Sequence, residues 1–136
     1  MPPQFRLKDR DDALDLIRDY PFAAVVSVLD GSPVVSHLPV IVTGTEPSIV
    51  LAAHFARANP HWKCVESSAP TLFFHGPHGY ISPRWYTNPE HTVPTWNYAI
   101  VRITAQARIV DPAATRDIVE SLTREMEAGA PNAWTV

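Results

Sequence analysis

The segment HFARANPHWK, His54–Lys63, combines residue types that favour binding of an anion. Arg57 stands where a predicted strand gives way to a short helix, so the loop can present a guanidinium fork. A helix opening at Asn59 would point free backbone N–H groups outward, and its dipole favours negative charge. Lys63 adds a point charge one turn further on. The segment predicts a phosphate-binding site, and the alternative is that Asn59 only caps the helix while Trp62 fills the core.

A second segment, HGPHGYISPRWY at His75–Tyr86, is rich in aromatic side chains. Tyr80, Trp85 and Tyr86 could wall a flat ring, and Ser82 could hydrogen-bond to it. The two histidines, three residues apart, have metal-like spacing but lack nearby carboxylate or thiol ligands, so we expect no metal there. We expect an irregular loop over residues 76–86. In the alternative to ring binding, prolines fix this loop and its aromatic residues only cover the mouth of a barrel.

A third segment, PTWNY, leads into a long extended run. Trp96 would be an apolar wall beside Asn97, whose amide can read the edge of a ring or satisfy backbone groups. A buried amide without a partner would be costly, so Asn97 has a specific role in either case.

The charge distribution also places a ligand in the middle of the chain. The net charge of the 136 residues is −3, which argues against nucleic-acid binding through bulk charge. Residues 54–108 nevertheless carry five bases and two acids, together with five of the six histidines and nine of the thirteen aromatic residues. A planar anionic ligand suits this composition better than DNA does.

Composition and length exclude several other classes of protein. Hydrophobic residues make up 46% of the chain, which excludes a disordered segment. The single cysteine, Cys64, excludes an intrachain disulfide and sites with several cysteines, and it fits a reducing cytoplasm. The N-terminus has no apolar signal core, and no apolar run is long enough to span a bilayer. We therefore expect a cytoplasmic protein of one domain that does not enter the membrane.

The chain contains signals for two terminal helices. Asp9 or Asp11 can cap a first helix with Ala13, Leu14 and Ile17 on one face, which Pro21 ends. A last helix begins at Asp111-Pro112, ends at Gly129 and is expected to bury four apolar residues, which are Ile118, Val119, Leu122 and Met126.

Between these helices we expect strands joined largely by hairpins. Phe22–Leu29 is an unbroken apolar run typical of a strand buried on both faces. The turn at Asp30-Gly31 leads to its partner, Val34–Val42, in which Pro39 marks an edge or a bulge. The remaining predicted elements are strands at Ile49–Phe55, Thr71–His75 and Thr95–Val110 and a short helix at His61–Ser67. This order predicts a mainly β, α+β fold with an antiparallel sheet curled enough to form a split barrel.

No motif of nucleophilic catalysis or of dinucleotide binding occurs. Neither terminal helix is basic on one face, so the sequence does not support direct DNA binding. The six histidines leave open an axial ligand to haem iron.

Together, the segments PFAAVVS, SHLPVIV, HFARANPHWK, GPHGYISPRWY, PTWNY and EAGAPNAWTV resemble the PaiB family in content and order. These proteins have the FMN-binding split-barrel fold of pyridoxamine-phosphate oxidases and are often labelled negative transcriptional regulators. The resemblance runs from Phe5 to Val136 and implies one FMN-binding domain over residues 1–136. Family members continue with a late strand and a KLSQNR-like motif, so we expect this chain to lack the C-terminal part of the family.

The resemblance implies a homodimer with flavin sites at the subunit interface, and it carries cofactor-binding positions onto this chain. His37, Leu38 and Pro39 would lie on the strand that lines the cofactor. The phosphate side would be held by His54, Arg57, Asn59 and Lys63. The ring side would be shaped by His78, Tyr80, Ser82, Trp96 and Asn97.

The resemblance implies a flavoprotein whose effect on transcription is indirect or needs a partner. Haem-dependent piperazate synthases, which form an N–N bond, are close relatives with a similar ARANPHW stretch. In that alternative haem b replaces FMN, with His54 or His61 as the axial ligand. A third hypothesis is a flavin-dependent oxidoreductase acting on a small molecule.

Overall fold

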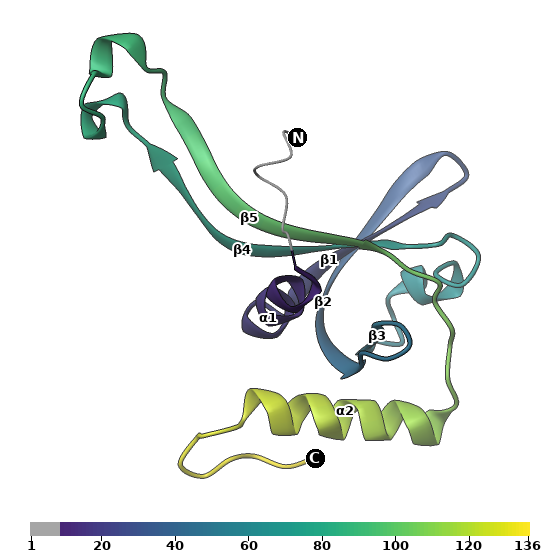
Figure 1. Ribbon diagram of the computed structural model, residues 1–136. Helices are drawn as coiled ribbons and strands as arrows, with labels where there is room; N and C mark the ends of the chain where they lie inside the picture. The colour runs from purple at the N-terminus through teal and green to yellow at the C-terminus, as the bar shows by residue number, and fades with distance from the viewer. Residues whose placement is uncertain (1–8) are drawn as a thin grey trace.

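The computed structural model describes residues 9–136 (Figure 1), so Phe5, where the resemblance begins, lies outside the described residues. The helices and strands follow one another as α1 (Arg10–Asp19), β1 (Phe22–Leu29), β2 (Ser32–Gly44), β3 (Val50–Ala53), η2 (Pro60–Lys63), β4 (Thr71–Ile81), η3 (Pro83–Trp85), η4 (Pro89–His91), β5 (Thr95–Thr104) and α2 (Pro112–Met126), where η marks a 3₁₀ helix.

The strands form one antiparallel sheet in the order β3-β2-β1-β4-β5. In the middle strand, Val25 lies opposite Ser36 of β2 on one side and opposite Leu72 of β4 on the other. The tip half of the β4–β5 hairpin extends away from the rest of the sheet, with η3 and η4 at its end (Figure 1). The fold is a mainly β, split-barrel-like α+β fold, as the sequence predicted.

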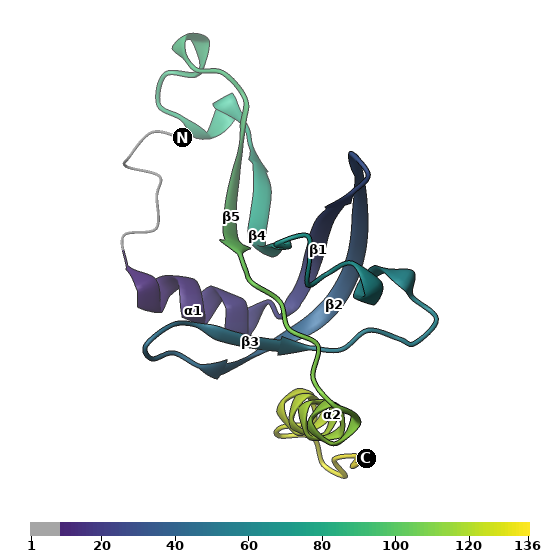
Figure 2. The ribbon, with the colours of Figure 1, turned by 90° about the vertical axis from the view of Figure 1, so that its right-hand side faces the viewer.

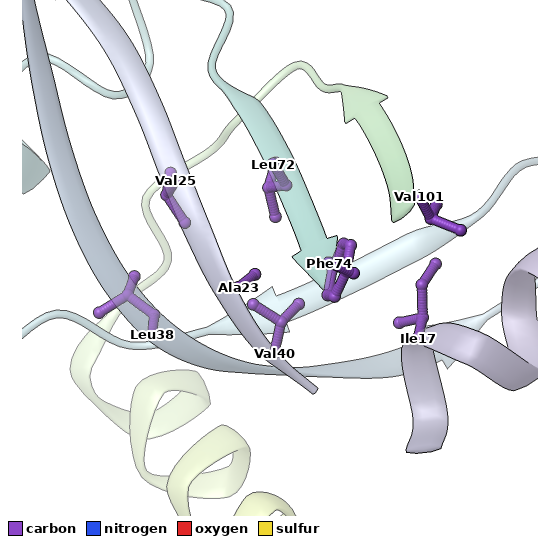
Figure 3. Close-up of a cluster of buried hydrophobic side chains, with 8 residues drawn as sticks. All are labelled: Ile17, Ala23, Val25, Leu38, Val40, Leu72, Phe74 and Val101. Carbon is purple, nitrogen blue, oxygen red and sulfur yellow. The ribbon is translucent and has the colours of Figure 1, made fainter. Parts of the chain in front are cut away.

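The core lies on one face of the sheet, which we call the inner face. Phe74 of β4 is completely buried at its centre, and Ile17 of α1 packs beside it (Figure 3). Alternating residues of β1 and β2, among them Val25 and Val40, and Leu72 of β4 and Val101 of β5 complete the cluster. α1 contacts β2, β4 and β5, whereas α2 contacts β2 and β3 and lies below β3 in Figure 2.

Both α-helices begin at the caps that their sequences offer. Asp9 accepts a hydrogen bond from the backbone N–H of Asp11, and Asp111 accepts one from that of Ala114. In α2 the burial prediction was only partly right. Leu122 is buried and Ile118 and Val119 are half-buried, but Met126 is exposed because it lies in the last turn.

The prediction that β1 is buried on both faces was wrong. Ala23, Val25 and Ser27 point inward and are buried, whereas Phe22 and Val28 point outward and are 62% and 61% exposed. A strand is also apolar throughout when both faces of its sheet are apolar but no other part of the chain covers one of them.

The prediction that β4 ends at His75 was also wrong, and much of the expected irregular loop is strand. β4 continues to Ile81, because a bulge between His75 and His78 absorbs Gly76 and Pro77 before pairing resumes opposite Tyr98. The side chain of Leu16 and the backbone of Ala99 approach Gly76 so closely that a Cβ atom would lie 3.1 Å and 3.2 Å from them.

Other elements are shorter than expected. The third strand is limited to Val50–Ala53, the fifth ends at Thr104, and the helix after Asn59 is a single 3₁₀ turn. Pro39 sits at neither an outer edge nor the β2 bulge, which lies between Val42 and Gly44. Instead it lies where pairing with β1 ends and pairing with β3 begins, and the Val40 N–H bonds to the carbonyl of Pro21 on the β1 side. The nitrogen of Pro39 therefore faces the side beyond the end of β3, where no ladder bond is lost.

Candidate functional site

Asn59 fastens the start of η2 to the sheet instead of pointing into solvent. Its Oδ1 accepts a hydrogen bond from the backbone N–H of His61 at 3.0 Å, and its Nδ2 donates to Ser36 Oγ at 2.9 Å. The predicted capping role is therefore present. Because both ends of the amide have partners within the chain, these two bonds hold the segment in place.

His61 occupies a polar corner of the otherwise apolar inner face. Its side chain is 1% exposed and lies between Ser27 of β1 and Ser36 of β2. Nδ1 is 2.9 Å from Ser36 Oγ, and Nε2 is 2.8 Å from Ser27 Oγ. Burial lowers the pKa of His61 below its ordinary value, because the charged imidazolium loses its hydration. Both ring nitrogens have partners, so this arrangement offers an iron atom no free ligand at His61.

The charged side chains of the segment are on the surface. Arg57 and Lys63 are exposed, and Lys63 Nζ lies 5.8 Å above the ring centre of Trp62. Trp62 Nε1 donates to the carbonyl of Arg57 at 3.3 Å, which braces the loop from outside. The alternative that Trp62 fills the core was wrong, because the indole covers the outside of this turn. Within one chain the segment is thus a cationic surface and not an enclosed pocket.

His54, at the start of the same segment, has an unpartnered nitrogen. Its Nδ1 is buried and is the one buried side-chain nitrogen or oxygen, among the residues that the structure describes, without a hydrogen-bond partner. Buried polar atoms are normally satisfied, so this atom is suited to a group that the chain itself does not supply. The cationic surface at Arg57 and Lys63 provides the charge that a phosphate needs.

A second set of predicted residues lies on the face of the sheet opposite the core, which we call the outer face. Tyr80 pairs with Trp96 and His78 with Tyr98, so the four side chains project from the same face of the hairpin. Trp96 Nε1 donates to His78 Nδ1 at 3.3 Å, and their rings stack at 5.9 Å. Around the β4 bulge, three of the four border a shallow cavity of about 210 Å³, whose lining is His75, Gly76, His78, Trp96, Tyr98, Ala99 and Ile100.

The outer face continues across β1 and β2 as an apolar surface. His37 and Phe22 stack on it with ring centres 6.0 Å apart. Arg102, opposite Phe73, brings a positive charge to the same face. In the pairs of β1 with β2, of β1 with β4 and of β4 with β5, no residue on this face is acidic; the residues are Phe22, Ala24, Val26, Val28, Pro33, Val35, His37, Pro39, Thr71, Phe73, His75, His78, Tyr80, Trp96, Tyr98, Ile100, Arg102 and Thr104.

The structure therefore divides the predicted cofactor residues into groups. His37, Pro39, His78, Tyr80 and Trp96 share the outer face. Leu38 points to the inner face, where Asn59 is also anchored. The exposed Arg57 and Lys63 lie on the same segment as Asn59, His54–Lys63.

Two ring-side residues occupy other positions. Ser82 is buried and caps η3, where its Oγ accepts from the backbone N–H of Arg84 at 3.3 Å. Asn97 is exposed and follows Trp96 directly in β5, so the two side chains point to opposite faces.

Sequence reasoning missed the inward-facing serines and Arg102. The serines had a usable signal, since a serine at an inward position of an apolar strand must find a polar partner. Ser27 and Ser36 stand at such positions in FAAVVSVL and VVSHL. Arg102 gave no comparable signal, because its place opposite Phe73 depends on the register across the bulge.

Within residues 9–136, no group of three or more histidine, cysteine, aspartate or glutamate side chains is arranged to hold a metal ion. In the same part of the chain, no helix is long and apolar enough to cross a membrane.

Comparison with known proteins gives consistent results. The family model of an FMN-binding domain matches residues 1–136. The chain is 30% identical over 128 residues to protease synthase and sporulation protein PAI 2 of Bacillus subtilis, covering 93% of this chain and 59% of that protein. It is 32% identical over 108 residues to the uncharacterized protein YKL070W of Saccharomyces cerevisiae, covering 74% and 64% of the two. The chain thus spans about three-fifths of the length of these relatives.

A solved structure shows the same fold. The FAD and heme binding protein from Mycobacterium smegmatis superimposes with a TM-score of 0.69 at 19% identity, over 90% of this chain and 56% of that one.

Proposed function

Because the chain belongs to the PaiB family of FMN-binding domains, whose model its whole length matches, we propose that two copies of it together bind FMN. In this proposal Arg57 and Lys63 of one copy bind the phosphate, and the hairpin residues of the other copy contact the isoalloxazine ring. When bound, FMN supplies the capacity to accept and return a hydride or electrons.

The observation that carries this proposal is the separation of the two groups of residues in a single chain. The anchored segment lies against the inner face at β1 and β2, whereas His78, Tyr80 and Trp96 project from the outer face of the hairpin. The tip half of that hairpin extends away from the sheet (Figure 1). An arm of this kind can reach a second copy, and its exposed aromatic side chains would be covered there.

The residues present fit the chemistry of FMN. Arg57 and Lys63 provide a fork and a point charge for the phosphate dianion. Trp96 and Tyr80 provide flat apolar surface for a flat ring. The unpartnered Nδ1 of His54 can exchange one hydrogen bond with a polar group of the bound nucleotide.

The helices favour an indirect effect on transcription, in line with a flavoprotein that acts on a small molecule. In α1, Arg18 is paired with Asp15, and in α2, Arg116 is paired with Glu120. Neither helix presents the basic stripe that contacts the phosphates of DNA.

A second candidate is a haem protein with His54 as the axial ligand. The free Nδ1 of His54 is the observation that favours it, and the M. smegmatis protein of the same fold is named for binding both FAD and haem. The histidine chemistry is suitable, since a neutral imidazole is a common axial ligand.

Binding titrations followed by flavin fluorescence test the main proposal. Arg57→Ala removes a charge-assisted contact worth about 1.5–3 kcal/mol, so FMN should bind roughly ten- to a hundred-fold more weakly. The matched control is Arg116→Ala, which removes an exposed arginine on α2 and should leave the affinity unchanged. Equal affinities of wild type and Arg57→Ala would remove Arg57 from the site. A Soret band without flavin absorption in the purified protein would favour haem.

A further inference from the structure

We propose that His61 is a positioning residue: as a neutral imidazole with its proton on Nε2, it clamps the segment that carries Arg57 and Lys63 onto β1 and β2. In this role His61 never touches the ligand. The inference rests on the proposed anion-binding function of that segment, and it assigns a role to three buried polar residues, Ser27, Ser36 and His61, that cofactor contacts do not explain.

The donors and acceptors around His61 fix its tautomer, starting from the Ser36 side. Ser36 Oγ accepts the hydrogen bond from Asn59 Nδ2, so its single proton is free to be donated. The acceptor in reach is His61 Nδ1 at 2.9 Å, which must then be unprotonated. A neutral imidazole carries its proton on the other nitrogen, so Nε2 donates to Ser27 Oγ at 2.8 Å.

Ser27 and Ser68 can accommodate the same tautomer. Ser68 Oγ is 2.7 Å from Ser27 Oγ and 3.3 Å from the carbonyl of Val65. Ser68 Oγ is placed to donate to either neighbour, and its one proton serves only one of them; when that proton goes to the carbonyl of Val65, Ser68 Oγ can accept from Ser27. Every hydroxyl then has a partner. The opposite tautomer would direct two donors at Ser36 Oγ and leave the proton of Ser36 without a recorded acceptor.

In the arrangement that gives every hydroxyl proton an acceptor, the hydrogen bonds run from the amide of Asn59 through Ser36, His61, Ser27 and Ser68 to the carbonyl of Val65. They join η2 to two adjacent strands at once. Ser27, Ser36 and His61 are all buried, and the ring of Phe55 closes the site at 5.2 Å from the ring of His61. Water has little access, so each lost bond leaves a buried group unsatisfied.

The clamp acts on the ligand site through the backbone. Asn59 caps η2 and also bonds Ser36, and Arg57 is two residues before it. Lys63 is two residues after His61, within the same 3₁₀ turn. Loosening the network would therefore let both cations move, without removing either one. A side chain that binds through preorganisation loses affinity when its support is removed.

The test is a double-mutant cycle on FMN affinity with Ser36→Ala and Arg57→Ala. Ser36→Ala removes the hydrogen bonds to Asn59 and to His61 and should raise the Kd about three- to ten-fold, because only part of the lost support is felt at the cations. Ser36→Thr, which keeps the hydroxyl, should restore most of the affinity. In the Arg57→Ala background, Ser36→Ala should weaken binding less than in wild type, because only the part of the clamp's effect that acts through Lys63 remains. Equal effects of Ser36→Ala in both backgrounds, or an unchanged Kd with only a lower Tm, would overturn the proposal.

Nitrogen NMR of the histidine side chains provides the readout that does not depend on FMN. His61 should show a protonated Nε2 and an unprotonated Nδ1, and Ser36→Ala should speed amide exchange at residues 55–59 while Ser36→Thr should not. A protonated Nδ1, or unchanged exchange in Ser36→Ala, would refute the clamp. If wild type fails to bind FMN while these signatures are present, the proposed function is wrong and the clamp stands.

Discussion

Acid should destabilise this protein through His61. Its imidazole is neutral in the folded chain, because burial lowers its pKa below the ordinary value of 6.5. As the pH falls below about 6.5, His61 binds a proton in the unfolded chain but stays neutral in the folded chain. Stability is therefore fully present above the pKa of the unfolded chain and is lost as the pH falls toward the lower pKa of the folded one.

The size of this effect follows from the single proton involved. The free energy of unfolding changes by at most about 1.4 kcal/mol per pH unit while the proton is bound in the unfolded state alone. We expect a slope near this maximum, because the side chains bonded to the imidazole are the uncharged hydroxyls of Ser27 and Ser36, which do not stabilise an imidazolium by charge. Lys63 and Glu66 on the same segment are exposed.

Urea unfolding between about pH 5 and pH 7 measures the slope. His61→Gln carries no titrating proton and should flatten the dependence in this range, although it is less stable at every pH. His91→Gln, on an exposed histidine in η4, is the matched control and should keep the slope of wild type. Equal slopes in wild type and His61→Gln would refute the assignment of this pH dependence to the buried imidazole.

Two further predictions concern the fold. Gly76→Ala should destabilise the protein by about 1–3 kcal/mol, because its Cβ would lie 3.1 Å from Leu16 Cδ1 and 3.2 Å from the carbonyl of Ala99. The control is Gly79→Ala, whose Cβ meets no atom within 4 Å. Equal midpoints of urea unfolding for the two variants would contradict the tight bulge. Phe74→Ala should cost about 3–5 kcal/mol, because the ring is completely buried at the centre of the core, and a loss below about 1 kcal/mol in the same assay would show that the core lies elsewhere.

The regular parts of the fold were predictable because their signals are local. Asp111 with Pro112 fixes the start of α2, and Asp30 with Gly31 fixes the β1–β2 turn, where both residues have positive φ. The continuation of β4 was not predictable from Gly76 and Pro77, which usually end a strand. Pairing with β5 overrides them, and a pairing partner is not visible in the local sequence.

The candidate site was predictable in its residue types more than in their roles. Arg57 and Lys63 are exposed cations, as expected of a phosphate-binding segment that one chain leaves open. Asn59 faces inward because its partner, Ser36, comes from a distant strand. Such roles depend on which residues meet across the sheet, and this information enters only with the register of the strands.

The central claim is that a second copy completes the FMN site. Tyr98→Lys tests it most directly, because Tyr98 is 54% exposed on the outer face of the hairpin and a lysine there should block pairing without disturbing the chain's own core. The control is Met126→Lys, at an exposed apolar residue of α2. Mass by light scattering and FMN affinity are measured on the same samples. Wild type and Met126→Lys should be dimers that bind FMN, and Tyr98→Lys should be a monomer that has lost most of its affinity. A Tyr98→Lys monomer that binds FMN as tightly as wild type would contradict the account.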